Sequence, residues 1–246
     1  MQYRHATATG HAALDAALVS APGRPTLPVR LTVELFGRAR ERLGTRPVTV
    51  WDPCCGAGAT LAVLGLRCPG VTALAGTDAD PGPLDLARRN LGLLGPGGLD
   101  ARADELDARA REHAKPSYAE AAAAVRALRP ASRPAWSVSP ADALDPAATA
   151  AALGEHTPDV VLADLPHGRQ TGWAADGSGS DPGTGPEAAF LTGVAAVLAP
   201  DAVVVAVGPG RSVPLPDGVR PLERVRAGHR AAVLVRAGDL PRIMAA

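Results

Sequence analysis

The chain has 246 residues, which is enough for one large domain or two small ones with a buried core. Its hydrophobic content of 46% argues against disorder of the whole chain. The 25 lysines and arginines balance the 25 aspartates and glutamates, so net charge offers no argument for a nucleic-acid partner. The N-terminal stretch has no long apolar run, which predicts neither a signal peptide nor a membrane span.

Residues 1–46 are expected to form an N-terminal arm and a helix. The segment up to about position 24 is Ala-rich and is either a short helix or a loose arm. A helix is then predicted from Pro28, with Gly44 as its stop. Arg38, Arg40 and Arg42 fall mostly on its polar face, which is either solvated or, in the sharper alternative, contacts phosphate. The apolar face of this helix comprises Leu31, Leu35, Phe36, Ala39 and Leu43.

Strands and helices alternate in the rest of the chain. This pattern predicts an α/β fold with a mostly parallel sheet, helices on both faces and an antiparallel C-terminal hairpin, all in a single domain spanning 1–246. The predicted strands are Val48–Asp52, Val71–Thr77, Ala135–Ser139, Asp159–Ala163 and Val203–Val207. The predicted helices are Ala59–Leu66, Pro83–Leu94, Ala147–Leu153 and Glu187–Leu198, and the hairpin joins Leu222–Arg226 to Ala231–Arg236.

Two segments depart from this alternation. Residues 101–133 are charged and then Ala-rich, which predicts a helical insertion between the second and third strands. Residues 165–186 follow the fourth strand directly and are rich in Gly, Ser, Asp and Pro without periodicity. A stretch of that length without a pattern is typical of a functional loop or of disorder, and we expect a mobile loop that binds the substrate.

A glycine motif follows the first predicted strand. Asp52 closes the strand, and the chain enters the next helix through Gly56 and Gly58, which is typical of a nucleotide-type cofactor site. Dinucleotide sites have a third glycine where this chain has Leu61, and a carboxylate would repel their pyrophosphate. The motif therefore favours the cationic, phosphate-free cofactor S-adenosylmethionine over a dinucleotide. The alternative is a tight turn in an unrelated α/β protein.

Acids follow four of the predicted strands. Asp78 lies 20 residues after Gly58, which is the spacing expected for an acid that contacts ribose hydroxyls. Asp142 could accept a hydrogen bond from the adenine amino group, and Asp164 ends the fourth strand. Ligands of open α/β sheets bind beyond the carboxyl ends of the strands, so these acids are expected to share one site. The expected cofactor-binding residues are Asp52, Cys54, Gly56, Gly58, Asp78, Ala79, Asp142 and Ala143.

The three cysteines predict neither a metal site nor a disulfide. Cys54 and Cys55 are adjacent and Cys68 is distant, so zinc-ligand spacing is lacking. Cys54 and Cys55 are interpreted as small, weakly polar side chains beneath the cofactor. A reduced, cytoplasmic protein without a metal is the expectation.

The sequence after the fourth strand predicts the chemistry. Asp164-Leu165-Pro166-His167 resembles the Asp/Asn-Pro-Pro-Tyr/Phe motif of S-adenosylmethionine-dependent N-methyltransferases, in which the polar head and a backbone carbonyl accept hydrogen bonds from the target nitrogen. Here Leu165 replaces the first proline, and His167 replaces the aromatic residue that stacks on the target ring. The alternative is an ordinary turn from strand to loop with a surface histidine.

Six segments together resemble the avilamycin-resistance ribosomal RNA methyltransferases of the AviRa family. The resemblance runs from about Ser20 to Arg236, and its Asp-Pro-Cys-Cys-Gly and Lys-Pro-Ser-Tyr stretches are the most specific. The segments are Ser20-Ala21-Pro22-Gly23, Pro28-Val29-Arg30-Leu31, Trp51-Asp52-Pro53-Cys54-Cys55-Gly56, Val63-Leu64-Gly65-Leu66, Lys115-Pro116-Ser117-Tyr118, and Pro158-Asp159-Val160-Val161-Leu162 running into Asp164-Leu165-Pro166.

The resemblance implies a Rossmann-like class I methyltransferase fold with seven strands and an added helical segment. The implied substrate is a guanine of large-subunit 23S ribosomal RNA, methylated at ring N1, with resistance to an orthosomycin antibiotic as the biological role. Asp164 is expected to orient the guanine and accept its proton, although it could instead contact the cofactor ammonium. His167 and Trp173 are expected to stack on the base, and Arg169 either contacts a phosphate or is solvated. The family has Tyr in place of His167.

Other functions remain open at this stage. The same cofactor could serve an N-methyltransferase that acts on another guanine position, a small molecule or a protein. A non-catalytic RNA-binding protein with a relic cofactor pocket is a further alternative. Asp52 argues against a third alternative, a nucleotide-dependent oxidoreductase. A monomer is expected.

Overall fold

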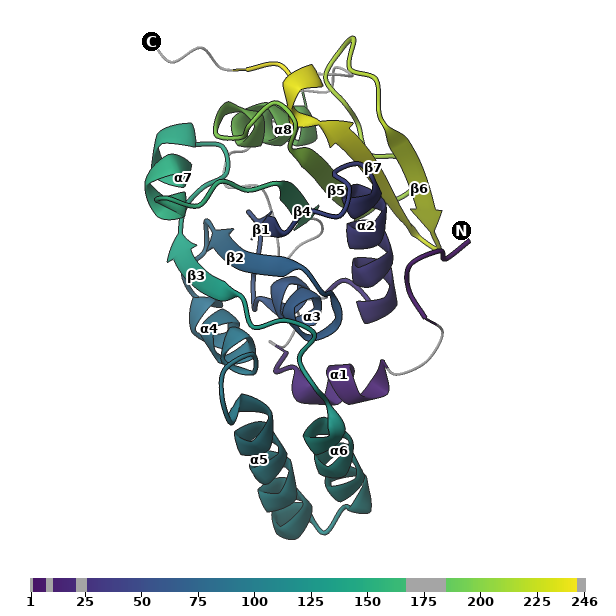
Figure 1. Ribbon diagram of the computed structural model, residues 1–246, viewed down its shortest axis with the longest axis vertical. Coiled ribbons are helices and arrows are strands. Elements are labelled where there is room, and N and C mark those ends of the chain that lie inside the picture. The colour runs from purple at the N-terminus through teal and green to yellow at the C-terminus, as the bar shows by residue number, and fades with distance from the viewer. Residues whose placement is uncertain (1, 8–10, 21–25, 167–184, 243–246) are drawn as a thin grey trace.

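The computed structural model describes residues 2–7, 11–20, 26–166 and 185–242. The strands form one seven-stranded sheet in the order β3-β2-β1-β4-β5-β7-β6 (Figure 1). β1 to β5 run parallel, whereas β7 is antiparallel to both β5 and β6. The mostly parallel sheet and its antiparallel hairpin, both predicted from the sequence, are confirmed. The strands are β1 (Val48–Asp52), β2 (Val71–Asp78), β3 (Ala135–Pro140), β4 (Val160–Asp164), β5 (Val203–Pro209), β6 (Glu223–Ala227) and β7 (Arg230–Arg236).

Helices cover both faces of this sheet. One face packs against α2, α3 and α4 in a large apolar cluster, and the other packs against α7 and α8 in a second cluster. β4 and β5 contribute alternate residues to the two clusters, as expected for strands buried on both faces. The helices are α1 (Ala12–Ala17), α2 (Val29–Glu41), α3 (Ala59–Arg67), α4 (Leu84–Gly92), α5 (Gly98–His113), α6 (Pro116–Ala127), α7 (Pro146–Leu153) and α8 (Pro186–Ala196), followed by a 3-10 turn at Ala237–Asp239.

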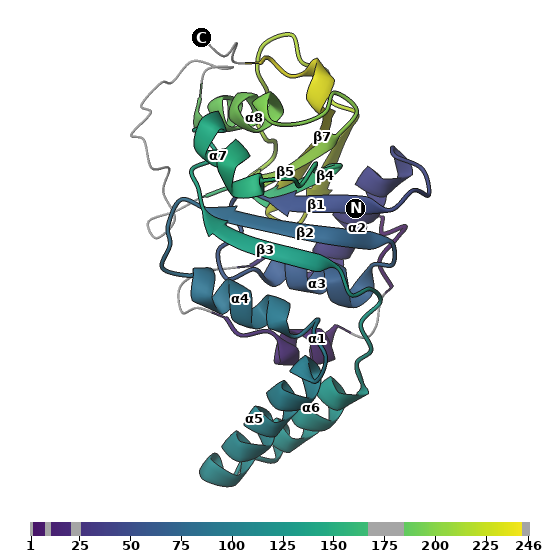
Figure 2. The same cartoon turned by 60° about the vertical axis from the view of Figure 1, so that its left-hand side comes forward.

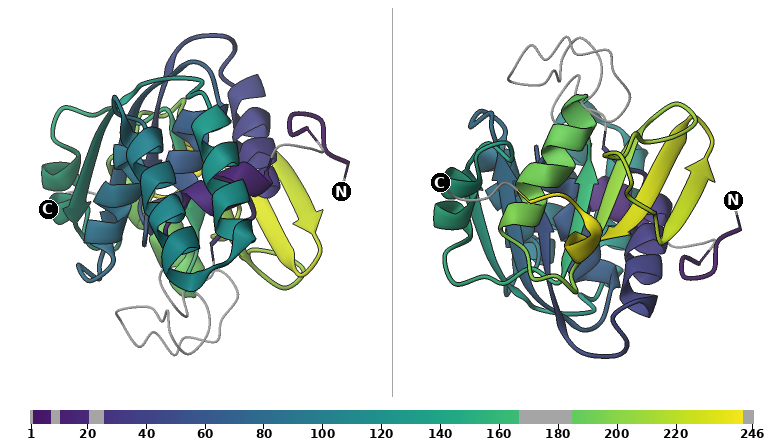
Figure 3. Two further views of the ribbon diagram at one scale, coloured as in Figure 1. Left: turned by 90° about the horizontal axis from the view of Figure 1, so that it is seen from below. Right: turned by 90° about the horizontal axis from the view of Figure 1, so that it is seen from above.

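Helices α5 and α6 form a hairpin that projects from the sheet at the end opposite α8 (Figures 1 and 2). Ala114 adopts a left-handed conformation between them, and Pro116 starts α6, where its missing N–H is harmless. Seen from below in Figure 3, α1 lies beside this hairpin. Arg102 of α5 donates to the carbonyls of Ala17 (3.0 Å) and Ala16 (3.2 Å), so a cation satisfies the C-terminal end of α1.

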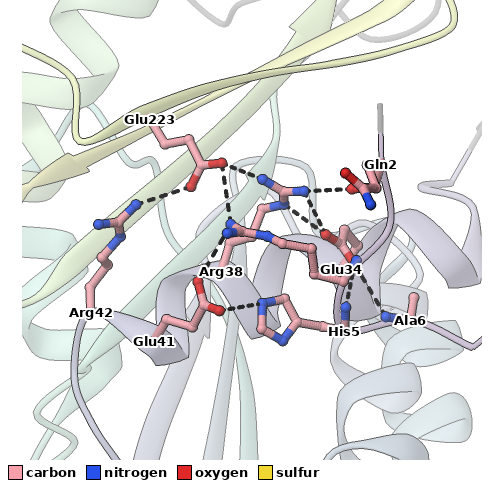
Figure 4. A network of polar contacts seen from close by, with 9 residues as sticks. Gln2, His5, Ala6, Glu34, Arg38, Glu41, Arg42 and Glu223 are labelled. Atoms are coloured by element: carbon pink, nitrogen blue, oxygen red, sulfur yellow. Dashed lines mark hydrogen bonds and ion pairs between the residues drawn. The ribbon is translucent and has the colours of Figure 1, made fainter.

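Helix α2 corrects one expectation about its arginines. Arg38, expected on the polar face, is only 7% exposed. Its guanidinium bonds Glu34 one turn earlier and Glu223 at the start of β6, a residue 185 positions away in the sequence (Figure 4). A buried arginine needs such carboxylate partners. Arg38 therefore has a structural role and is available neither to solvent nor to a phosphate.

Both ends of the expected 165–186 loop are tied to regular structure. The Leu165 N–H continues the sheet by donating to the Val207 carbonyl (2.8 Å), and Pro186 is the first residue of α8. Residues 167–184, which include His167, Arg169 and Trp173, lie outside the described residues. Among the helices that are described, none is both long and apolar enough to span a membrane.

Candidate cofactor and substrate site at the carboxyl edge of the sheet

Three acids meet at one edge of the sheet. Asp52, Asp78 and Asp164 are the last residues of the parallel strands β1, β2 and β4. Each lies an even number of residues after a strand residue of the larger apolar cluster, so all three project from the same face of the sheet. The structure therefore brings together three of the four acids that the sequence placed at strand ends.

Asp52 is the most deeply buried member of this group, with 2% of its surface exposed. Burial raises the pKa of Asp52 well above its ordinary range, and the charges of Asp78 and Asp164 raise it further. The N–H of Cys54 donates to Asp52 Oδ1 (3.1 Å) and opposes this shift. In the described part of the chain, no arginine or histidine forms an ion pair with Asp52. A carboxylate in this environment favours a cationic ligand.

The segment 52–58 forms a tight loop between β1 and α3. The Cys55 N–H donates to the Thr77 carbonyl (2.9 Å) and the Gly58 N–H donates to the Cys55 carbonyl (2.7 Å). Gly56 and Gly58 have φ angles of +50° and +71°, which side chains with a Cβ rarely adopt. A Cβ on Gly58 would also lie 3.0 Å from Ala87 of α4, whereas one on Gly56 would meet nothing within 4 Å. The loop therefore presents bare backbone at Gly56, in front of the acids.

Asp78 joins this loop to the end of β2. Its Oδ2 accepts the Gly56 N–H (2.8 Å) and its Oδ1 accepts the Asp80 N–H (3.0 Å). A carboxylate has about four acceptor positions, so one such group can accept from several donors at once. Asp78 thus ties the glycine loop to the end of β2.

Asn90 supports the same loop from α4. Its side chain is fully buried and donates to the Ala57 carbonyl (2.8 Å) and to the Val19 carbonyl (2.9 Å), while its Oδ1 accepts the Val19 N–H (2.8 Å). One amide therefore holds both the glycine loop and the N-terminal arm. The sequence interpretation missed this residue, because an asparagine within a helix carries no signal of long-range pairing.

The cysteines of the loop have thiols whose pKa values are raised by their surroundings. All three cysteines are free, and burial raises the pKa of the Cys54 and Cys55 thiols. Burial also raises the pKa of Cys68 to about 12. A thiol that stays protonated is a poor nucleophile and a poor metal ligand. Within the residues that can be described, no group of His, Cys, Asp and Glu side chains could hold a metal ion.

The remaining expected cofactor residues lie at the ends of β2 and β3. Asp142 is half-buried, and its Oδ1 accepts the Leu144 N–H (2.9 Å) in the turn that leads to α7. Ala79 is exposed, whereas Ala143 is buried with its carbonyl against Gly193 of α8. Any contact from Ala143 to a ligand would therefore have to come from its backbone.

Asp164 has a partner that the sequence interpretation did not include. Arg230, the first residue of β7, forms an ion pair and a hydrogen bond with Asp164 Oδ1. Both side chains are largely buried, at 14% and 18% exposure for the acid and the arginine. Arg230 lies opposite Pro209 in the sheet register, and Asp164 lies opposite Val207 on the other side of β5. This register places the two residues on either side of β5, where their side chains meet across the strand.

Leu165 explains one departure from the N-methyltransferase motif. Its N–H is used in the sheet bond to Val207, which a proline could not make. Its side chain is 2% exposed and packs in the cluster beneath α8. Pro166 follows as a half-buried residue.

Comparison with known proteins identifies the family. A sequence model of the family described as rRNA methyltransferase AviRa matches residues 1–230. The 23S rRNA (guanine(2535)-N(1))-methyltransferase of Streptomyces viridochromogenes is 44% identical over 97% of both chains. A solved structure of the rRNA methyltransferase AviRa from the same organism superposes with a TM-score of 0.87, at 42% identity over 98% of both chains. A putative RNA methyltransferase from Pyrococcus horikoshii, 12% identical, shares the fold over 91% of this chain and 96% of its own, with a TM-score of 0.52. The chain therefore belongs to the AviRa family of ribosomal RNA methyltransferases.

Proposed function

We propose that this protein transfers a methyl group from S-adenosylmethionine to ring N1 of a guanine in 23S ribosomal RNA. The observation that carries the proposal is the gathering of Asp52, Asp78 and Asp164 at one edge of the sheet, in a chain of an rRNA methyltransferase family. The relative that is 44% identical is named for this base, ring atom and RNA. Resistance to an orthosomycin antibiotic of the avilamycin type is the proposed biological role.

The residues of the β1–β2 half fit the proposed cofactor. S-adenosylmethionine carries an ammonium and a sulfonium, and the buried Asp52 without a cationic partner among the described residues suits this charge. The Gly56 backbone allows close approach, and Asp78 is proposed to accept from the ribose hydroxyls. Cys54, Gly58, Ala79, Asp142 and Ala143 complete the proposed binding set.

Asp164 is proposed as the catalytic residue. S-adenosylmethionine supplies an electrophilic methyl group. The guanine N1 loses its proton as the new N–C bond forms, and Asp164, held by Arg230, is proposed to accept that proton and to orient the base edge. The backbone carbonyls of Leu165 and Pro166 would hold the exocyclic amino group. Holding the acceptor nitrogen in line with the methyl group supplies about 7–11 kcal/mol of the barrier reduction.

The base must leave its stack to reach this edge. His167 and Trp173 are proposed to stack on the flipped guanine, and Arg169 to contact a neighbouring phosphate; all three follow Pro166 in the sequence and lie outside the described residues. We further propose that the protein acts as a monomer in the cytoplasm.

Transfer of a labelled methyl group tests this function. The purified protein is incubated with labelled S-adenosylmethionine and protein-free 23S rRNA, and the modified position is mapped by reverse-transcription stops and by mass spectrometry of nucleosides. The expected product is N1-methylguanine at one position. Asp164→Asn should lower the transfer rate by about 10²–10⁴-fold while cofactor affinity persists. Label in a protein, in a small molecule or at another guanine atom would contradict the proposal, as would loss of cofactor affinity as the only defect of Asp164→Asn.

A further inference from the structure

Charge is segregated along the carboxyl edge of the sheet. The ends of β2 and β3 are acidic. Residues 78–80 contain Asp78 and Asp80, and residues 140–145 contain Asp142 and Asp145. On the opposite half, residues 207–216 and 224–236 contain no aspartate or glutamate. This separation occurs within a chain whose formal net charge is zero, so the overall charge balance conceals it.

Arginines gather where β5, β6 and β7 reach this edge. The Gly210 N–H donates to the His229 carbonyl (2.8 Å), which joins the segment after β5 to the β6–β7 turn. Arg211 follows Gly210 directly, and Arg226 lies opposite Ala231 near the end of β6. We call Arg211, Arg226 and His229 the basic rim. Viewed from above in Figure 3, the β6–β7 hairpin lies on the opposite side of the molecule from α7, as the strand order requires.

The rim residues differ from Arg230 in their partners. Arg230 is neutralised by Asp164, whereas Arg211 and Arg226 are exposed and form no ion pair with any residue that the structure describes. His229 is exposed as well. Neighbouring cations without carboxylate partners create a positive potential that attracts a polyanion, and the planar guanidinium fork matches phosphate geometry.

Resting on the function proposed above, we infer that the basic rim binds RNA phosphates next to the target guanine. The RNA then approaches over the β5–β7–β6 half of the edge, while the cationic cofactor occupies the acidic β1–β2–β3 half. Asp164 lies between the two halves, at the end of β4. The RNA and the cofactor, which have opposite charges, are thereby attracted to neighbouring parts of the edge. The acidic half also repels RNA from the cofactor pocket.

Charge reversal at the rim tests this assignment. The variant carries Arg211→Glu and Arg226→Glu, and the matched control carries Arg220→Glu, an exposed arginine that precedes β6 at the other end of that strand. Binding of a 23S rRNA transcript is measured over a series of salt concentrations, together with KM and kcat for RNA, the Kd for S-adenosylmethionine and the Tm.

For the rim variant we expect an RNA Kd at least about tenfold higher. The slope of log K against log salt should fall by about one unit for each arginine. KM for RNA should rise, with kcat, cofactor Kd and Tm close to those of the wild type. The Arg220→Glu control should match the wild type in all of these quantities.

Three results would overturn the inference, and they are distinguishable. If the wild-type protein methylates the transcript, but the rim variant has the same RNA affinity and the same salt slope as the wild type, the rim is refuted and the proposed function stands. A wild-type protein that neither binds nor methylates the transcript would refute the proposed function and the rim with it. An equal loss in the Arg220→Glu control would show a general effect of charge and would also count against the rim.

Discussion

Arg230 bonds Asp164 across an intervening strand: the acid ends β4, the arginine begins β7, and β5 lies between them. Asp164 also lies close enough to Asp52 for its charge to raise the pKa of Asp52. Three carboxylates at one edge repel one another, and the ion pair with Arg230 offsets part of this repulsion at Asp164. The ion pair therefore both orients Asp164 and favours its ionised form.

Removal of Arg230 should alter the pH dependence of methyl transfer. In Arg230→Ala the ionised form of Asp164 loses the positive charge of Arg230, so activity on the acid side should be half-maximal at a higher pH than in the wild type. We expect kcat at neutral pH to fall by about 10–10²-fold, because a charge-assisted bond contributes about 1.5–3 kcal/mol. Arg230→Lys keeps the charge and should restore part of the rate and the wild-type profile. An unshifted profile in Arg230→Ala would limit Arg230 to a structural role.

Replacement of Asp52 should have opposite effects on the stability of the ligand-free protein and on cofactor binding. The pKa of Asp52 is higher in the folded protein than in the unfolded chain, so ionisation of Asp52 favours unfolding. As pH rises above about 3.9, Asp52 ionises first in the unfolded chain, and the free energy of unfolding falls. This fall continues until the pH passes the raised pKa of the folded protein. Asp52→Asn should therefore raise the Tm of the ligand-free protein at pH 7, by about 2–4 °C for each 1 kcal/mol regained.

The same Asp52→Asn variant should lose most of the Tm increase that S-adenosylmethionine gives the wild type, because its amide cannot neutralise an ammonium. Differential scanning fluorimetry with and without cofactor measures both effects. A ligand-free variant that is less stable than the wild type, or one that keeps the full cofactor-induced shift, would contradict this interpretation of Asp52.

Asp78 should control cofactor affinity through two routes. Asp78→Asn weakens the bond from the Gly56 N–H and removes a charged acceptor for the ribose hydroxyls. We expect the Kd for S-adenosylmethionine, measured by isothermal titration calorimetry, to rise by about 10–10²-fold. Asp85→Asn is the matched control, since its carboxylate is 95% exposed on α4 and bonds only Arg88 among the described residues. Equal effects of the two substitutions would argue against a specific role of Asp78.

Glu34 should stabilise the fold in a pH-dependent way. Burial alone would raise the pKa of Glu34, but the backbone N–H groups of His5, Ala6 and Arg4 and the side chain of Arg38 outweigh it, so that its pKa is lowered (Figure 4). A lowered folded pKa adds stability that is fully present above the unfolded value of about 4.3 and is lost as pH falls through the folded value.

Urea unfolding of Glu34→Gln measures this contribution. We expect a loss of about 1.5–3 kcal/mol at pH 7, and a difference from the wild type that shrinks as pH falls below about 4.3. Glu41→Gln on the same helix is the control, because its side chain is 43% exposed and its ion pairs should contribute little. A wild-type-minus-variant difference that stays constant with pH would contradict the assigned role of Glu34.

The sequence predicted those features that depend on local pattern. The bounds of β1 are the predicted ones, because β-branched residues lead directly into Asp52 and the glycine turn. Local pattern could not predict contacts set by strand register or by distant pairing. Arg230 reaches Asp164 only because β7 inserts antiparallel beside β5, and the burial of Arg38 depends on Glu223, which lies far away in the sequence. Leu165 departs from the expected motif because its N–H belongs to the sheet.

A crystal structure of the protein with S-adenosylmethionine bound would show whether the carboxyl edge of the sheet is the methyl-transfer site. We expect the cofactor across the carboxyl ends of β1 and β2, with its ammonium near Asp52, its ribose hydroxyls on Asp78 and its methyl group directed toward Asp164. A cofactor bound elsewhere, or bound at this edge with its methyl group turned away from Asp164, would contradict it.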